Sequence, residues 1–189
     1  MKKKTLALVL ALTLLVAGVV GGTLAWLTDQ TAEVKNTFTV GDINIGLTET
    51  TADYKMVPGN TIAKDPTVTV EANSEACWLF VKVENGIADI EDSTNTIAAQ
   101  LAAKGWTAVD GATNVYAYKS TVAGGANVPV FESFKIDQSV IGGNKPVDYV
   151  GENKYLGDYT DKKIVVTAYA IQADGFDDAA AAWTAYAAK

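Results

Sequence analysis

Residues 76–84, with the sequence ACWLFVKVE, decide the fold of this chain. Every odd-numbered position from 77 to 83 is apolar, and the even-numbered positions include Trp78 and Phe80. A period of two predicts a β-strand whose side chains point alternately to opposite faces. Because both faces carry apolar groups, we expect both to be at least partly covered, as in a β-sandwich.

Shorter segments around this strand predict the remaining elements. Further extended pieces are expected at 36–48, 67–71, 115–119, 128–136 and 164–173. An Ala-rich helix is expected at 97–104, ended by Gly105, and a second at 176–187, behind Asp177 and Asp178. Turns are expected at 57–60 and 123–126, and 142–153 has no regular pattern. The predicted fold class is mostly β: a jelly-roll-like β-sandwich with one or two short peripheral helices, after an N-terminal signal helix.

The N-terminus has the pattern of a secretory signal peptide. Three lysines at 2–4 precede a nearly continuous apolar run at 5–20, and small residues follow at 21–25. We expect cleavage after Ala25, with Trp26 as the nearby alternative site. An uncleaved anchor spanning 6–27 is the competing interpretation, but the cluster of small residues favours cleavage. The expected division is a signal peptide, 1–25, and one secreted β-sandwich domain, 26–189, in the extracellular matrix or at the cell surface.

Other routes of attachment to the cell lack their sequence signals. The single cysteine, Cys77, is far from the leader, where a lipoprotein needs one. No Glu lies inside the hydrophobic run, as a type IV pilin requires, and 185–189 lacks the apolar tail of a sortase substrate. The expectation is that the processed chain is not covalently tied to the cell.

The charge of the chain excludes several partners. Loss of the three leader lysines takes the formal net charge from −7 to −10, and the sequence contains no Arg and no His. Nucleic-acid binding needs a cationic patch, so we expect no nucleic-acid partner. The same charge disfavours anionic lipid, and contact with the membrane is expected only during export.

No residue pattern predicts catalysis. Without His, the commonest general base and zinc ligand are missing, and no Ser–His or Cys–His pair can form. One cysteine cannot make an intrachain disulfide. Because Cys77 lies in an apolar run, a buried structural thiol is its favoured interpretation.

Two acidic clusters and a set of tyrosines are the remaining candidate sites. Asp89, Glu91 and Asp92 form one cluster and 158–161 the other, and their oxygens make calcium the only candidate cofactor. Their spacing does not match an EF-hand, so solvated loop charge is favoured over a metal site. A sugar-binding face is a weaker interpretation than packing for the tyrosines, which are Tyr116, Tyr118, Tyr149, Tyr155 and Tyr159.

Several segments in a fixed order carry a family resemblance. They are GGTLAWLTD at 21–29, NTFTVG at 36–41, Pro58-Gly59, 64–70 with Asn73, the strand at 78–83, and AYAIQADGF at 168–176. This order resembles the TasA/camelysin family of Gram-positive bacteria, whose leaders are cut by a signal peptidase of the SipW type. The resemblance spans most of the chain and is most specific at the leader and the first strand.

The resemblance implies a secreted subunit of biofilm-matrix fibres, assembled with itself or with paralogues. In that family the mature N-terminal segment can complete a sheet in the next subunit, head to tail. Residues 26–35 suit such a donor strand, because no Pro or Gly interrupts them and apolar groups are provided by Trp26 or Leu27, Ala32 and Val34. The alternatives are a loose N-terminus or an edge strand folded back on its own domain.

Two other functions stay open at this stage. Some family members are described as cell-surface metalloendopeptidases, but carboxylates alone favour hard cations over hydrolytic zinc. A surface adhesin or glycan-binding module that never polymerises is the third alternative. The expected function is the structural subunit, without enzymatic activity.

Overall fold

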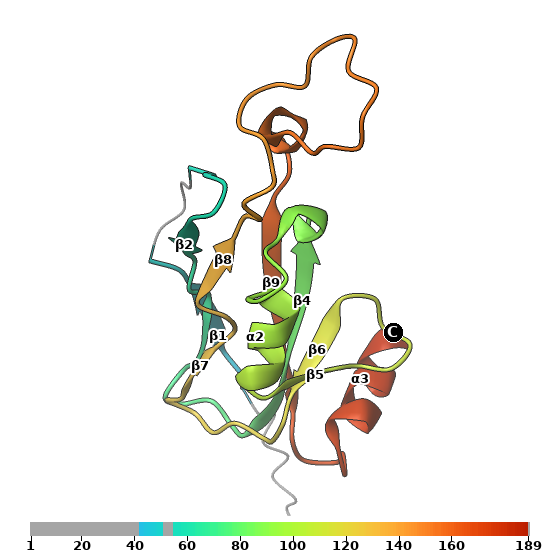
Figure 1. Ribbon diagram of the computed structural model, residues 1–189. Helices are drawn as coiled ribbons and strands as arrows, with labels where there is room; N and C mark the ends of the chain where they lie inside the picture. Colours follow the sequence, from blue (N-terminus) through green and yellow to red (C-terminus); the bar gives the residue numbers. More distant parts are fainter. Residues whose placement is uncertain (1–41, 51–54, 189) are drawn as a thin grey trace, which may run out of the picture. The chain divides into compact units, whose positions relative to one another are not determined.

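The strand expected at 76–84 is present as β4, Cys77–Asn85, and it organises the first of two layers. The computed structural model describes residues 42–50 and 55–188, which lie in one unit of the chain, Val40–Lys189. In this layer β4 pairs with β6 (Val115–Tyr118) and β9 (Ile164–Gln172), and β5 (Trp106–Ala108) extends the antiparallel sheet to the order β5-β6-β4-β9. Figure 1 shows β4 and β9 running side by side through the length of the sheet.

The second layer consists of two smaller antiparallel sheets. One has the order β1-β3-β7, formed by Ile45–Thr48, Thr67–Val70 and Asn127–Pro129. The other pairs β2 (Thr61–Ala63) with β8 (Ser133–Lys135). The main core unites residues from both layers, including Val68, Val70, Leu79, Val81, Val128 and Phe134. This arrangement confirms the predicted mostly-β fold with antiparallel sheets and short helices.

Both expected helices form, with capping that the sequence provides. Helix α2 (Ile97–Ala103) begins where the Thr96 hydroxyl accepts the Ala99 N–H, at 3.1 Å, and it ends before Gly105, whose φ is +90°. Helix α3 (Ala179–Ala187) begins at Asp178, which accepts the Ala181 N–H at 2.8 Å. Two 3-10 turns, η1 (Ala88–Ile90) and η2 (Leu156–Tyr159), complete the elements. Within the described residues, no helix has the length and apolar character needed to cross a bilayer.

The two faces of β4 are covered by different kinds of structure. Its odd-numbered side chains point into the core between the layers, whereas Phe80 packs beneath α3, with its ring centroid 5.0 Å from that of Trp183. Tyr169 of β9 lies 5.6 Å from the same indole. The sequence therefore predicted coverage of both faces correctly, but a helix rather than a sheet covers the outer one.

The strand expected at 128–136 is present in two pieces, β7 and β8, which belong to two sheets but keep one register opposite residues 61–69. Between the two pieces the Val130 N–H donates to Pro66 O at 2.8 Å and the Lys64 N–H donates to Glu132 O at 3.0 Å, so the register continues across the interruption. The Gln100 side chain on α2 then accepts the N–H groups of Glu132 and Ser133 and donates to Ser133 O. The Gln100 side chain thus bonds to the backbone where the strand is interrupted.

Other expectations are met where they fall on described residues. The turn at 57–60 is closed by the Asn60 N–H to Val57 O at 3.1 Å, and 142–153 is irregular. In the loop at 123–126, a Cβ on Gly124 would lie 2.6 Å from Ser74 O, so the site requires glycine. The short strands β2 and β5 were not predicted. The extended piece expected at 36–48 is seen only as β1, and its residues before 42 lie outside the described part.

One side of the sandwich is closed by a tryptophan. The buried Trp106 on the edge strand β5 donates its indole N–H to Pro129 O of β7, at 3.0 Å, and so links the two layers. Tyr118 packs edge-on against the same indole, with 5.1 Å between ring centroids. Helix α2 adds Ile97 and Leu101 to the core.

An ion pair joins the segment before α2 to β8. The carboxylate of Asp92 lies 2.8 Å from Lys135 Nζ, and the Asp92 N–H donates to Lys135 O at 2.8 Å. The hydrogen bond from Lys135 lowers the pKa of Asp92, with further help from the Thr94 hydroxyl and N–H.

We predict that Phe80→Ala lowers the free energy of unfolding by about 3–5 kcal/mol, because it empties a fully buried aromatic site beneath Trp183. Guanidinium unfolding followed by circular dichroism measures this. Thr107→Ala, at an exposed position of β5, is the control and should change the value by less than about 0.5 kcal/mol. A loss below about 1 kcal/mol for Phe80→Ala would contradict the packing of α3 on this face.

Acid should destabilise the fold partly through Asp92. Its folded pKa is lowered, so the stability it contributes is present above the unfolded pKa of about 3.9 and is lost as the pH falls below it. Asp92→Asn should therefore be less stable than the native chain at pH 7, and the difference should shrink as the pH falls below about 4. Thermal unfolding at a series of pH values tests this, and a difference that does not vary with pH would speak against it.

Candidate functional site

The side of the sandwich opposite Trp106 ends in a long strand that is paired on one edge only. All nine residues of β9 pair with β4, from Ile164 opposite Asn85 to Gln172 opposite Cys77. Among the described residues, no strand pairs with the other edge of β9. An unpaired edge of this length is a template on which a further strand can add.

The backbone groups that face this free edge can be assigned. The Ala173 N–H donates to Ala76 O at 2.9 Å, whereas the Cys77 N–H points away from β9, to Val122 O. Because backbone direction alternates along a strand, the odd-numbered residues of β9 bond to β4. The N–H and C=O groups that face outward belong to Ile164, Val166, Ala168, Ala170 and Gln172.

Nothing in the sequence of β9 protects this edge. The strand IVVTAYAIQ contains no charge, no proline and no glycine. Exposed edges in natural proteins are usually guarded by lysine, proline or a bulge. Lys162 and Lys163 precede the strand and Asp174 follows it, so the charges lie only at its two ends.

The core is incompletely covered where this edge meets the second layer. β9 and β1 lie beside each other there, although they belong to different sheets. Leu47 of β1, whose side chain is on the same face as the buried Val68, is 41% exposed. Several more apolar side chains along this seam are only partly buried against the core, namely Ile43, Ile45, Ile164, Val166, Ala168 and Ala170.

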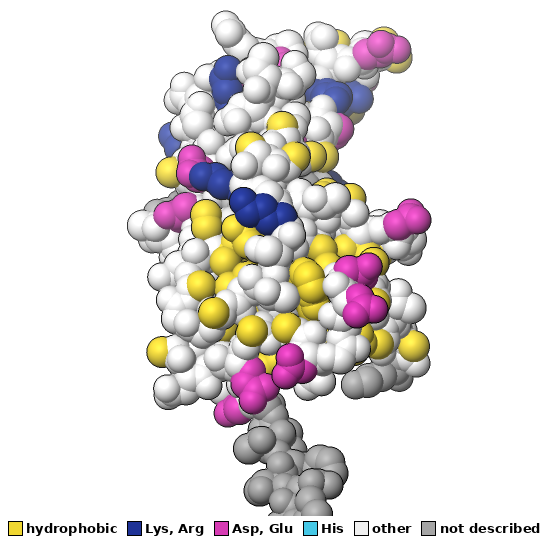
Figure 2. Space-filling view, turned by 90° about the horizontal axis from the view of Figure 1, so that it is seen from below, with side chains coloured by type: hydrophobic (Ala, Val, Ile, Leu, Met, Phe, Trp, Pro, Cys, Tyr) yellow, Lys and Arg dark blue, Asp and Glu magenta, His cyan; other side chains and the backbone are white. Residues whose placement is uncertain are grey.

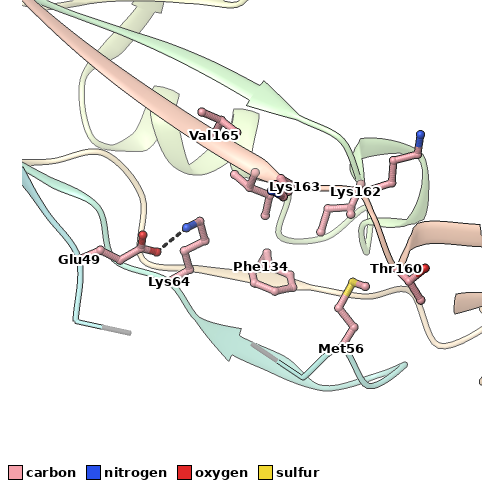
Figure 3. Close-up of a pocket in the computed structure, with 10 residues that line it drawn as sticks. Glu49, Met56, Lys64, Phe134, Thr160, Lys162, Lys163 and Val165 are labelled. Atoms are coloured by element: carbon pink, nitrogen blue, oxygen red, sulfur yellow. Dashed lines mark hydrogen bonds and ion pairs between the residues drawn. The ribbon is translucent and has the colours of Figure 1, made fainter. Parts of the chain in front are cut away.

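A groove of about 540 Å³ lies at the beginning of β9 and continues this seam. Its lining includes Met56, Ile87, Phe134 and Ile164, together with the ion pair between Lys64 and Glu49. Figure 3 shows Met56, Lys64 and Phe134 projecting from the second layer toward β9. The groove can therefore accept an extended segment that carries both apolar and polar side chains.

The carboxylates do not form a metal centre in the described part of the chain. Glu91 accepts the Ile97 N–H at 3.1 Å and the Asn85 amide at 3.0 Å, Asp92 pairs with Lys135, and Asp89 accepts the Tyr159 hydroxyl at 2.5 Å. Burial raises the pKa of Glu91, and the bond to Asp89 raises the pKa of Tyr159 to about 12. Across residues 42–50 and 55–188, no three His, Cys, Asp or Glu side chains gather as ligands.

The five tyrosines singled out in the sequence are spread over different parts of the molecule. Tyr116 and Tyr118 of β6 pack against the main core. Tyr149 and Tyr155 pack edge to face, with 5.3 Å between ring centroids, and Tyr159 belongs to η2. They do not form one common face.

The cysteine is located as the sequence predicted. Cys77 is fully buried, and this burial raises the pKa of its thiol. The thiol is therefore held in its protonated, unreactive form.

The residues predicted to act in processing and assembly lie outside the described part of the chain. These are Ala25 and Trp26 at the cleavage site, and Trp26, Leu27, Ala32 and Val34 in the donor segment. The sequence pattern of β9 indicates a strand but not its pairing partners, so it does not predict the receiving edge. The one local feature of that edge is the complete lack of charge over nine residues.

Comparison with known proteins gives one result. The family model described as Camelysin metallo-endopeptidase matches residues 1–122. No curated protein and no solved structure matches the chain. The matched region covers the predicted leader at 1–25, the strand β4 that organises the fold, and the edge strand β5. The chain therefore belongs to the camelysin family, as the order of its segments predicted.

Proposed function

We propose that this protein is a secreted structural subunit of extracellular biofilm-matrix fibres. Residues 26–35 of one subunit add as a strand to the free edge of β9 in the next. The observation that carries the proposal is the uncharged edge of β9, which has no strand partner within residues 42–50 and 55–188 and lies beside a seam of partly buried apolar side chains.

The residues of the β9 edge and those of the donor segment both favour strand addition. Outward N–H and C=O groups on β9 can bond to an incoming strand, and each backbone hydrogen bond contributes about 0.5–1.5 kcal/mol net. In an extended segment Trp26, Ala32 and Val34 share one face. That face can cover the exposed part of the core along the seam, while the charged Asp29 and Glu33 point away from it.

Repetition of this contact produces a fibre rather than a closed oligomer. The donated segment and the receiving edge are different surfaces of the subunit, so the contact is head to tail. Each added subunit presents a new free β9 edge. The same interaction can therefore continue without limit.

Export precedes assembly in this proposal. The leader, 1–25, directs the chain through the membrane, and a SipW-type signal peptidase removes it after Ala25. Cleavage frees the donor segment as the new N-terminus. The family membership supports a location outside the cell or at its surface.

The proposed role does not include catalysis. The family description names a metallo-endopeptidase, but the donor set here does not fit a hydrolytic zinc: the sequence has no His and its one thiol is buried. Asp89, Glu91 and Asp92 are each bound to different partners. Chelator-sensitive hydrolysis of casein by the pure protein would contradict this part of the proposal.

We predict that Ala168→Pro abolishes fibre formation and leaves a folded monomer. The substitution removes an N–H that faces the free edge, so the ladder to β4 keeps its bonds. Thr167→Pro is the matched control, because it removes an N–H bonded to β4 and should destabilise the monomer itself. Circular dichroism and negative-stain electron microscopy of the mature protein separate these effects.

Deletion of residues 26–35 should have the same result from the donor side: a folded monomer that does not polymerise. Mixing this deletion variant with Ala168→Pro should yield heterodimers at most, because the intact edge of one receives the segment of the other. Normal fibres from either variant alone would refute the proposed contact.

A further inference from the structure

The irregular segment at 142–153, called here the end loop, is held at its base by backbone hydrogen bonds but exposes apolar side chains. The Ile141 N–H donates to Lys154 O at 2.9 Å, and the Gly157 N–H donates to Gly143 O at 2.8 Å, which fixes the base of the loop. Inside it, the Tyr149 hydroxyl accepts the Asn153 N–H at 3.3 Å. Val147 and Val150 are nevertheless completely exposed. Figure 1 shows this loop projecting beyond the ends of the strands.

The opposite end of the sandwich is acidic. Asp42 O accepts the Glu75 N–H, Glu71 O accepts the Ser74 N–H, and the Ala173 N–H to Ala76 O bond brings Asp174 to the same end. These four acidic side chains, called here the acidic end, are all exposed, and no lysine occurs at 42–50, 71–77 or 173–178. Figure 2 looks onto this end and shows acidic groups at its lower edge, whereas the lysines lie higher in the view.

Strands β4 and β9 separate the two ends. Ile164 and Asn85 pair next to the end loop, and Gln172 and Cys77 pair next to the acidic end. Over the nine residues of β9 this separation is about 27 Å. A strand added to β9 can run in either direction, and the direction decides which end meets the next subunit.

The length of chain between residue 35 and Asp42 limits the directions in which the donor strand can add to β9. Seven residue steps join residue 35 to Asp42, and they span at most about 25 Å. If 26–35 lies antiparallel to β9, residue 35 ends beside the end loop, about 27 Å from the acidic end of that same subunit. The segment must then come from another copy, whose own acidic end lies close to the end loop. A parallel strand donated by another copy would instead bring two acidic ends together.

Charge favours the antiparallel direction. Two acidic ends in contact would oppose four carboxylates with four more, which is unfavourable. The end-loop side carries Lys145, Lys154, Lys162 and Lys163 together with an equal number of carboxylates over 142–163, so it is neutral overall. Antiparallel pairing also matches every strand pair in the described structure.

We infer that the end loop of each subunit docks against the acidic end of the next copy of this chain, with the donor strand antiparallel to β9. The contact buries Val147 and Val150 and pairs lysines of the end-loop side with carboxylates of Asp42, Glu71, Glu75 or Asp174. This inference rests on the proposed function, because it sets the direction of the same strand addition.

A cysteine pair tests the direction. Val150→Cys and Glu75→Cys in one mature chain should give a ladder of covalent oligomers when assembled fibres are treated with a flexible bismaleimide. Native Cys77 is fully buried and stays unlabelled in the folded chain. Thr107→Cys with Glu75→Cys is the matched control and should give no ladder. Dimers from Glu75→Cys alone would show that acidic ends meet, which overturns the inference while leaving strand addition intact.

A second pair of substitutions tests the energetic role of the loop. Val147→Ser with Val150→Ser should leave the unfolding midpoint unchanged, because both side chains are fully exposed in the monomer. The critical concentration for fibre growth should rise roughly tenfold or more, since two apolar side chains no longer become buried. Tyr186→Ser, at an exposed position on α3, should polymerise as the native chain does.

The outcomes separate the two proposals. Fibres from the double serine variant at the native critical concentration, without a Val150–Glu75 ladder, would overturn the inference alone. Absence of any fibre from the native mature chain would overturn the proposed function and this inference with it.

Discussion

The unsatisfied edge of β9 is the constraint on which the rest of this structure depends. Backbone N–H and C=O groups need partners, and along β9 those of alternate residues face outward without one among the described residues. Water can satisfy them only while the edge stays exposed. Because the strand has no charge, proline or bulge to keep another strand away, its most favourable partner is a further strand.

The two sides of the sandwich differ for reasons that lie in particular residues. On the β5 side, the indole N–H of Trp106 donates to Pro129 O and joins the layers. The Gln100 side chain accepts the N–H groups of Glu132 and Ser133, between β7 and β8 and at the start of β8. On the β9 side, Leu47 stays exposed and Ile164 and Val166 are only partly buried, beside a groove of about 540 Å³. One side is thus complete within the monomer. The β9 side has apolar side chains that a further strand would cover.

Much of this fold could be predicted from the sequence where the pattern is long. The nine-residue strands β4 and β9 and both helices were located, because their periodicity or caps are strong. β2 and β5 have three residues each, too few to show a period, and the interruption between β7 and β8 involves Gln100, which is distant in sequence. The donor segment could be proposed from its composition. The receiving edge could not, because pairing partners follow from topology rather than from local pattern.

Amide hydrogen exchange, resolved by residue along β9, tests the central claim most directly. In the monomer, the amides of Val166, Ala168 and Ala170 should exchange quickly, while those of Thr167 and Tyr169, bonded to β4, should be protected. In assembled fibres, both sets should be protected. Slow exchange at Val166, Ala168 and Ala170 already in the monomer, or fast exchange there in the fibre, would contradict the account.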